Sequence, residues 1–302
     1  MLPIKLELPE HFLDEEVRYG YTVTEKMKKV WAVELDLLNE FQKVCNQYNL
    51  KYYAIAGTLL GAVRHQGFIP WDDDVDVVMF REDYDKLISI ASSVFSAPYD
   101  FMASGKIEHF FRGHAQLRNR MTTGILPSEL KQKFSYNQGI WIDIFPLDGV
   151  PEENKKERFT YLKLRLMSKC LMNRRSKIHK RFLGKLLHMY LLLWEKITGD
   201  NFQRAHDRYE AKCRKMSNKY NEFISPIEFI NPPWNKNIWK KSNFKQSIEM
   251  PFEFMSLSVP KGYDNILRTN YGDYMKPTQV NSLHGETIMD PEKSYTEYLA
   301  KI

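Results

Sequence analysis

Residues 54–80 read AIAGTLLGAVRHQGFIPWDDDVDVVMF, and this stretch decides both the fold and where a site is sought. Directly before its apolar end it carries four aspartates within five positions: Asp72, Asp73, Asp74 and Asp76. Because like charges this close repel one another, the cluster needs a cation or solvent between its members. Hard divalent cations such as Mg²⁺ take oxygen ligands of this kind and commonly bridge to substrate phosphates. Metal-assisted phosphoryl chemistry is the first hypothesis, and a solvated acidic loop is the alternative.

The composition is that of a globular protein. The chain has 302 residues, of which 43% are hydrophobic and 27% charged, enough to bury one large core or two smaller ones. Its three cysteines form neither a disulfide framework nor a metal-ligand spacing, and the N-terminus lacks the layout of a signal peptide. We therefore expect a cytoplasmic protein. The net charge of +6 is uneven, since residues 161–220 hold sixteen Lys and Arg against four Asp and Glu.

Hydrophobic spacing and turn residues predict the order of elements. The first half should contain helices over 24–48, 59–65 and 81–95, strands over 52–56 and 75–79, short antiparallel strands within 99–125, and a strand over 139–145 that ends at Pro146–Gly149. Helices follow from 152 to 220, with one more near 263–271. This order is that of an α/β or α+β protein. We predict the α+β class: a mixed sheet with flanking helices over 1–150, and a helical, basic C-terminal part over 151–302.

Strand geometry predicts how the acids are used. Asp74 and Asp76 lie two positions apart on a strand, so their side chains project from the same face. Asp143 belongs to another apolar strand, where a buried charge costs several kcal/mol unless it is paired. If the two strands are neighbours, Asp143 completes a three-carboxylate metal site; the alternative is a salt bridge with a buried arginine. Gly57 and Thr58, between a strand and a helix, offer backbone N–H groups to a phosphate.

At this point the chain resembles a known family. The block over 53–76, the block GIWIDIFPLD over 139–148, and the block YGDYM over 271–275 with His284 downstream are similar to the hallmark segments of the LicD family. The pattern spans roughly residues 25 to 290, and its first block is long and nearly free of gaps. One departure is Lys276–Pro277, where many relatives have two prolines.

The resemblance implies a nucleotidyltransferase-like fold for the mixed sheet over 1–150, and it also implies a function. Members of the family transfer a phosphorylated alcohol from a nucleotide diphosphate donor to a glycan hydroxyl, and in bacterial members the group is phosphocholine taken from CDP-choline. The expected cofactor is Mg²⁺ (or Mn²⁺) on Asp74, Asp76 and Asp143, with Asp72 as a further catalytic carboxylate. CDP-choline or a similar CDP-alcohol would be the donor, and the acceptor a glycan of teichoic acid or lipopolysaccharide type.

Further residues are candidates for binding the donor. Arg64 and His65 lie at the end of the short helix that follows Gly57 and could reach the diphosphate. The alternative for Arg64 is an ion pair with the acidic cluster, and the alternative for His65 is a structural role. Arg118 could bind phosphate or be solvated at the surface. Tyr271 and His284 could line the donor or acceptor pocket. A quaternary ammonium favours aromatic faces, and the candidates for it are Trp71, Trp141, Tyr271 and Tyr274.

The basic middle of the chain allows two interpretations. The stretch over 169–197 has basic residues beside apolar ones at helical spacing, and such a helix can lie on an anionic membrane surface or pack on the core. A lipid-linked acceptor would suit peripheral contact with the cytoplasmic face of the membrane. The rival functions are transfer of ribitol or glycerol phosphate, nucleotide transfer to RNA, and non-enzymatic binding of glycan or lipid. No RNA-binding signature is visible, so we expect no nucleic acid partner.

Overall fold

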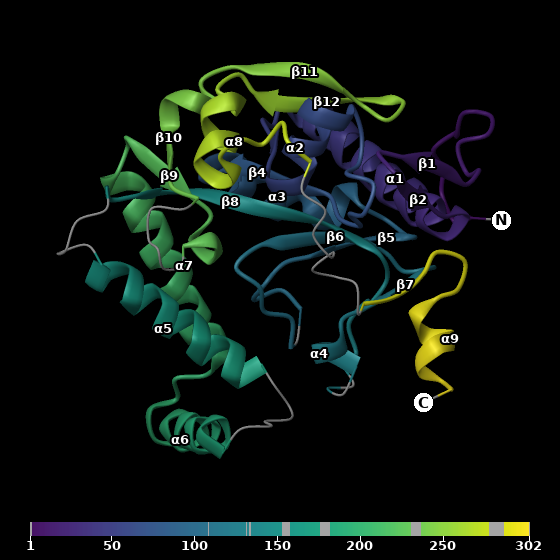
Figure 1. Cartoon of the computed structure of the whole chain (residues 1–302). Coiled ribbons are helices and arrows are strands. Elements are labelled where there is room, and N and C mark those ends of the chain that lie inside the picture. Colours follow the sequence, from purple (N-terminus) through teal and green to yellow (C-terminus); the bar gives the residue numbers. More distant parts are fainter. Residues whose placement is uncertain are drawn as a thin grey trace.

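The structure is a computed structural model that describes residues 2–107, 109–130, 132, 134–152, 158–175, 182–230, 237–277 and 287–301. Its centre is a mixed sheet of seven strands (Figure 1). The path through it runs β10 (Trp239–Lys240), β9 (Phe223–Ser225), β8 (Trp141–Val150), β4 (Asp76–Phe80) and β3 (Tyr53–Ala54), while β6 (Ala115–Asn119) pairs with β8, and β5 (Tyr99–Met102) with β6. Only β4 and β8 pair in parallel among these strands. The predicted α+β class is confirmed.

Smaller elements surround the sheet. Two-stranded units are formed by β1 (Glu16–Arg18) with β2 (Tyr21–Val23), β11 (Ser247–Phe252) with β12 (Met255–Pro260), and β7 (Thr123–Ile125) with β13 (Ile288–Asp290). The helices are α1 (Glu25–Tyr48), α2 (Ala56–His65), α3 (Arg81–Val94), α4 (Pro127–Leu130), α5 (Arg158–Arg175), α6 (Phe182–Thr198), α7 (Phe202–Lys219), α8 (Tyr263–Tyr271) and α9 (Tyr295–Leu299), with 3₁₀ turns η1 (Ile227–Phe229) and η2 (Lys241–Phe244). The strands after residue 220 were not predicted, because that segment has little periodicity.

Helix α1 covers the sheet as its pattern predicts. Thr24 caps it by accepting a hydrogen bond from the Met27 N–H at 3.3 Å, and Asn49 ends it in the left-handed conformation. The apolar stripe that includes Trp31, Leu35 and Phe41 is fully buried, and the helix packs on β6 and β8. The first predicted helix is therefore confirmed to within one residue.

Strand β8 is longer than predicted. The expected end at Pro146–Gly149 is wrong, since the strand continues to Val150. Its parallel pairing with β4 extends as far as Leu147, and β9 then pairs with Asp148 to Val150. The missing N–H of Pro146 removes one donor, but partners on both sides hold the strand beyond it. Strands from residues after 220 thus complete the sheet of the first half, and the division at residue 150 stays a prediction.

Helices α5, α6 and α7 form the basic part of the chain. Helix α7 packs on β8, α5 packs on α7, and α6 packs on α5, so α6 stands farthest from the sheet (Figure 1). The predicted helical stretch over 169–197 is divided between α5 and α6. None of the helices that the structure describes is both long and apolar enough to span a membrane.

An ion pair anchors this helical part to the sheet. The guanidinium of Arg81 donates from Nε to Asp148 Oδ1 at 2.8 Å and from Nη2 to Asp148 Oδ2 at 2.5 Å. Its Nη1 donates to Glu210 on α7 at 2.9 Å, and Ser217 Oγ donates to Asp148 at 2.6 Å. Asp148 is fully buried. Because its oxygens are engaged inside the protein, Asp148 has a structural role and does not contact a substrate hydroxyl.

We expect Asp148→Ala to destabilise the protein by about 3–5 kcal/mol, because it leaves the Arg81 charge buried without its main partner. Urea unfolding measures the change. The control is Lys43→Ala, which removes an exposed pair with Glu40 and should change the free energy of unfolding by less than about 1 kcal/mol. Equal effects of the two substitutions would contradict this role of Asp148.

Candidate active site

The site is built where β3, α2 and β4 meet. The Ile55 N–H donates to the Asp76 carbonyl at 3.1 Å, and the Asp76 N–H donates to Thr58 Oγ1 at 2.8 Å. Thr58 is buried, so its hydroxyl fixes the start of β4. Ala56 begins α2 with a φ of 51°, a conformation that alanine rarely adopts and that accumulates at functional sites. The predicted helix over 59–65 therefore starts three residues earlier.

Gly57 is the point of close approach between α2 and the acidic segment. A Cβ at this position would lie 2.4 Å from Asp72 Oδ2 and 3.9 Å from Asp74 Oδ1. Only glycine leaves room for the carboxylate of Asp72 at the N-terminal end of α2. Side chains from the acidic segment, rather than open space, thus lie next to the backbone that was predicted to bind phosphate.

The parallel pairing of β4 and β8 brings the predicted acids together. Asp76 and Asp143 are register partners, and the Asp143 N–H donates to the Val75 carbonyl at 2.9 Å. Register partners on neighbouring strands project from the same face of a sheet. The expectation that Asp143 lies on the strand beside Asp76 is confirmed. Its role as a metal ligand stays a prediction.

Carboxylates accumulate around Asp76. Burial raises the pKa of Asp76 well above its ordinary value, and the charges of Asp74, Asp143 and Asp72 raise it further. On the α1 side, Glu34 is buried, and its pKa is also raised well above the ordinary value, by burial and then by the acidic segment. The site therefore concentrates negative charge in a place with little solvent.

Asp143 has the opposite environment. Gln116 Nε2 donates to its Oδ1 at 2.6 Å, and Trp141 Nε1 donates to its Oδ2 at 3.1 Å. His114 Nε2 lies 3.0 Å from Oδ1, an ion pair with poor hydrogen-bond angles. Burial acts to raise the pKa of Asp143, but His114 and the neighbouring donors outweigh it, so the pKa falls below its usual range. Asp143 thus stays ionised.

His114 bridges two acids. Its Nδ1 lies 2.5 Å from Glu228 Oε2, and the Gly113 N–H donates to the other oxygen of Glu228. Burial lowers the pKa of His114, but the carboxylates of Glu228 and Asp143 outweigh burial and raise it to about 9. His114 is therefore an imidazolium at neutral pH, and it carries the compensating charge for Asp143. The expected alternative, a salt bridge with a buried arginine, is replaced by one with a histidine.

Arg118 does not face a substrate. Its side chain is fully buried, lies over the Trp141 ring at 4.8 Å, and donates from Nε and Nη2 to Gln116 Oε1 at 2.9 and 2.6 Å. Burial lowers its pKa to about 10. The expectations of phosphate binding and of surface solvation are both wrong for this residue. Arg118 instead orients Gln116, which in turn donates to Asp143.

Arg64 and His65 lie at the other end of α2. Arg64 Nη1 donates to the Tyr274 carbonyl at 2.7 Å, so it holds the segment after α8, and its Nε donates to His65 Nε2 at 2.8 Å. Burial and the charge of Arg64 lower the pKa of His65 to about 4, which makes it a neutral acceptor. The structure shows positioning roles for both, and contact with a diphosphate stays a prediction.

The aromatic candidates divide into two groups. Trp141 is buried under Arg118, and Tyr274 is buried and donates to Asp264 at 2.8 Å, so neither presents a free face to a ligand. Trp71 is partly exposed and Tyr271 is exposed. Burial raises the pKa of Tyr271, and the charges of Asp76, Asp72 and Asp74 raise it further. His284 lies outside the described residues.

Among the described residues, no group of three or more His, Cys, Asp or Glu side chains is arranged so that it could hold a metal ion. The described acidic side chains are neighbours, but in this structure they do not form a set of ligands around a single position. Two of the three predicted ligands, Asp76 and Asp143, are register partners, and the third, Asp74, raises the pKa of Asp76. The arrangement can attract a cation or accept a proton.

The sequence of this chain is similar to those of known proteins over the residues that form the site. Residues 49–166 match the nucleotidyltransferase domain of the LicD/FKTN/FKRP family, a range that contains every acid of the site except Glu34 and Glu228. The "Lipopolysaccharide cholinephosphotransferase LicD" of Haemophilus influenzae is 29% identical over 259 residues, which is 83% of this chain and 91% of that protein. The chain is therefore similar to the LicD family, and the similarity includes the family's nucleotidyltransferase domain over residues 49–166.

Two further relatives are shorter matches. Uncharacterised proteins of Rickettsia prowazekii and Rickettsia typhi are 39% and 44% identical over 79 residues. These 79 residues are 24% of this chain and 30% and 26% of the relatives. They support the family relation but carry no function.

Sequence reasoning missed part of this site. His114 follows a glycine directly before a short strand, Glu228 lies in a segment without periodicity, and Glu34 looks like the polar face of an amphipathic helix. No local pattern marks them. For Gln116 the signal was present, because Gln116 and Arg118 alternate on one strand and must share a face.

His114 should make stability depend on pH. Its pKa is about 9 in the folded protein against 6.5 ordinarily, so its stabilising effect is complete below pH 6.5 and is lost as the pH rises through 9. The loss is on the order of 3 kcal/mol. In EDTA-containing buffer, we expect the melting temperature of the native protein to fall from pH 6 to pH 9.5, and that of His114→Gln to fall much less. His11→Gln, at an exposed histidine, is the control and should keep the native slope. An unchanged slope in His114→Gln would refute the assignment.

Proposed function

We propose that this protein transfers phosphocholine from CDP-choline to a hydroxyl of a cell-surface glycan precursor of lipopolysaccharide or teichoic acid type, releasing CMP. Similarity to the family supports its being a transferase. The observation that carries the proposal is the similarity to a lipopolysaccharide cholinephosphotransferase over 91% of that protein's length. The similarity extends well beyond the nucleotidyltransferase domain, which supports a common donor and acceptor as well as a common catalytic core.

Mg²⁺ (or Mn²⁺) is the proposed cofactor, with Asp74, Asp76 and Asp143 as its ligands. The donor set fits the ion, because hard divalent cations select carboxylate oxygens. The raised pKa of Asp76 also fits, since it reports several negative charges at close range without enough positive charge to offset them. When bound, such an ion polarises phosphoryl oxygens and lowers the pKa of an attacking hydroxyl.

The residues of the chain would act on the acceptor and the donor. The acceptor hydroxyl oxygen attacks the phosphorus that bears choline, the bond from this phosphorus to the oxygen of CMP breaks, and CMP leaves with the bonding electrons. The hydroxyl proton goes to a carboxylate of the acidic segment outside the proposed ligand set, for which Asp72 is the candidate. Asp143, held ionised by His114, supplies fixed negative charge.

Choline recognition is assigned to the exposed aromatics. Tyr271 is exposed and Trp71 partly exposed, and the charges of the acidic segment raise the pKa of Tyr271. Aromatic faces and nearby carboxylates together favour a quaternary ammonium. The acceptor would be a lipid-linked glycan, and the protein would work at the cytoplasmic face of the membrane.

Transfer of radiolabelled phosphocholine from CDP-choline to lipopolysaccharide or teichoic acid precursors tests the function. We expect product and CMP in equal amounts with Mg²⁺ and neither after treatment with EDTA. CDP-ribitol and CDP-glycerol are the control donors. Product from one of these alone would reassign the transferred group, and release of CMP in EDTA would contradict the metal.

Asp76→Asn separates activity from folding. We expect transfer to fall by roughly 100- to 1,000-fold, the range for loss of one preorganised electrostatic group. The melting temperature at pH 7.5 should stay the same or rise, because a carboxylate with a raised pKa destabilises the fold when it is ionised. Asp14→Asn, at an exposed carboxylate in the N-terminal segment, is the control. Retained transfer in Asp76→Asn would overturn the proposed role of the acids.

A further inference from the structure

Exposed apolar side chains are concentrated on two helices. Within the described residues, eighteen large hydrophobic residues are exposed, and thirteen of them lie on α5 and α6. On α6 they are Phe182, Leu183, Leu186, Met189, Tyr190, Leu192, Leu193, Trp194 and Ile197. Single exposed apolar residues need no explanation, but a contiguous patch marks a binding surface.

Helix α6 is turned with its apolar side outward. Eight of its exposed residues recur at spacings of three and four and form one face, here called the outer face: Phe182, Leu183, Leu186, Met189, Tyr190, Leu193, Trp194 and Ile197. The opposite side carries His188, buried Leu191 and Glu195. An ordinary surface helix buries its apolar stripe and exposes its polar residues. The orientation of α6 is the reverse.

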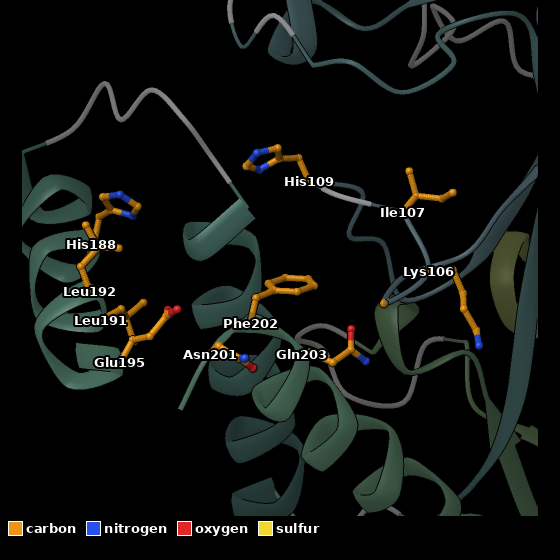
Figure 2. A pocket seen from close by; sticks show the side chains of 11 residues that line it. Lys106, Ile107, His109, His188, Leu191, Leu192, Glu195, Asn201, Phe202 and Gln203 are labelled. Atoms are coloured by element: carbon orange, nitrogen blue, oxygen red, sulfur yellow. The ribbon is translucent and has the colours of Figure 1, made fainter. Parts of the chain in front are cut away.

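A cavity lies on the inward side of α6. This cavity of about 440 Å³ lies between α6, the start of α7 and the segment around His109 (Figure 2). His188, Glu195 and Leu191 line it from α6, opposite Phe202 and His109. Because the side with the histidine and the glutamate faces the rest of the protein, the outer face has no described element of this chain against it.

Basic residues accompany the outer face. Between residues 163 and 196 the sequence has ten Lys and Arg and one acidic residue, a net charge of +9. Lys163 and Lys169 on α5, and Lys185 and Lys196 on α6, are exposed. Tyr190 and Trp194 on the outer face are aromatic residues with a polar tip, the kind that accumulates where an apolar phase meets water.

We propose that the outer face of α6 is a docking surface for an anionic lipid leaflet. The apolar side chains enter the boundary between headgroups and acyl chains, while the exposed lysines of α5 and α6 contact the negative headgroups. The charge complementarity selects a lipid surface over a second copy of this chain, since two copies would bring two strongly basic regions together. The biological role of this docking rests on the proposed function, because a lipid-linked acceptor is presented at such a surface. The lipid binding itself is independent of the proposed function.

Vesicle co-sedimentation of the full chain, without donor or acceptor, tests the surface. We expect binding to vesicles of phosphatidylglycerol and phosphatidylcholine, weaker binding to phosphatidylcholine alone, and loss of binding in high salt. The double substitution Leu186→Glu and Leu193→Glu should weaken binding by roughly 10-fold or more, since it removes two large apolar groups from the inserted face. Lys185→Glu should weaken it by roughly 5-fold.

The matched control introduces two glutamates at exposed apolar positions away from the outer face. Val17→Glu with Met121→Glu alters two exposed apolar residues outside α5 and α6, and it should bind vesicles as the native chain does. Melting temperatures verify that all variants are folded. Equal binding by the Leu186/Leu193 variant, or no binding by the native chain, would overturn the proposal. If the native chain does not bind vesicles but forms a dimer in sedimentation equilibrium, and the Leu186/Leu193 variant does not form this dimer, the outer face would be assigned to self-association. None of these outcomes depends on catalysis, so the proposed function can fail or stand separately.

Discussion

The parallel pairing of β4 with β8 is the constraint on which the site depends. It fixes Asp76 and Asp143 as register partners on one face of the sheet, so two carboxylates meet where little solvent reaches. The protein offsets this repulsion on one side only. Asp143 receives donors from Gln116 and Trp141 and the charge of His114, whereas Asp76 has further carboxylates as neighbours.

The buried polar groups around Asp143 are held in place by further partners. Arg118 orients Gln116, and Glu228 accepts from His114, so each group that touches Asp143 is itself held by a partner. These partners come from β6 and from the segment after β9, far apart in the sequence. A chain of satisfied polar groups of this kind fixes a unique arrangement, because removing one member leaves a buried partner unpaired. The sheet order, with β6 and β9 both on β8, makes the network possible.

Local signals in the sequence were enough for the acids and their strands. The apolar run after Asp76 and the alternation around Asp143 predicted both strands, and close spacing predicted that the acids act together. The exposure of Arg118 was predicted wrongly because the segment AQLRN contains mostly polar residues, yet all five residues are buried. Burial on both faces depends on α1 and β8, which no local pattern reveals. The same limit applies to α6, where periodicity predicted an apolar face but not the side of the helix that would be turned toward the protein.

The opposite pKa shifts of the two register partners assign them different chemistry. A carboxylate pair whose environments push their pKa values apart divides into one member that stays ionised and one that can hold a proton. The pKa of Asp143 is lowered because His114 and other donors contact it, and the pKa of Asp76 is raised by burial and by the acids around it. The repulsion that raises the pKa of Asp76 also lowers the stability of the folded protein at neutral pH. A protein retains such a destabilising cluster where function requires it, and here a positive charge brought by a ligand, whether a metal ion or a quaternary ammonium, would relieve the repulsion and gain affinity from it.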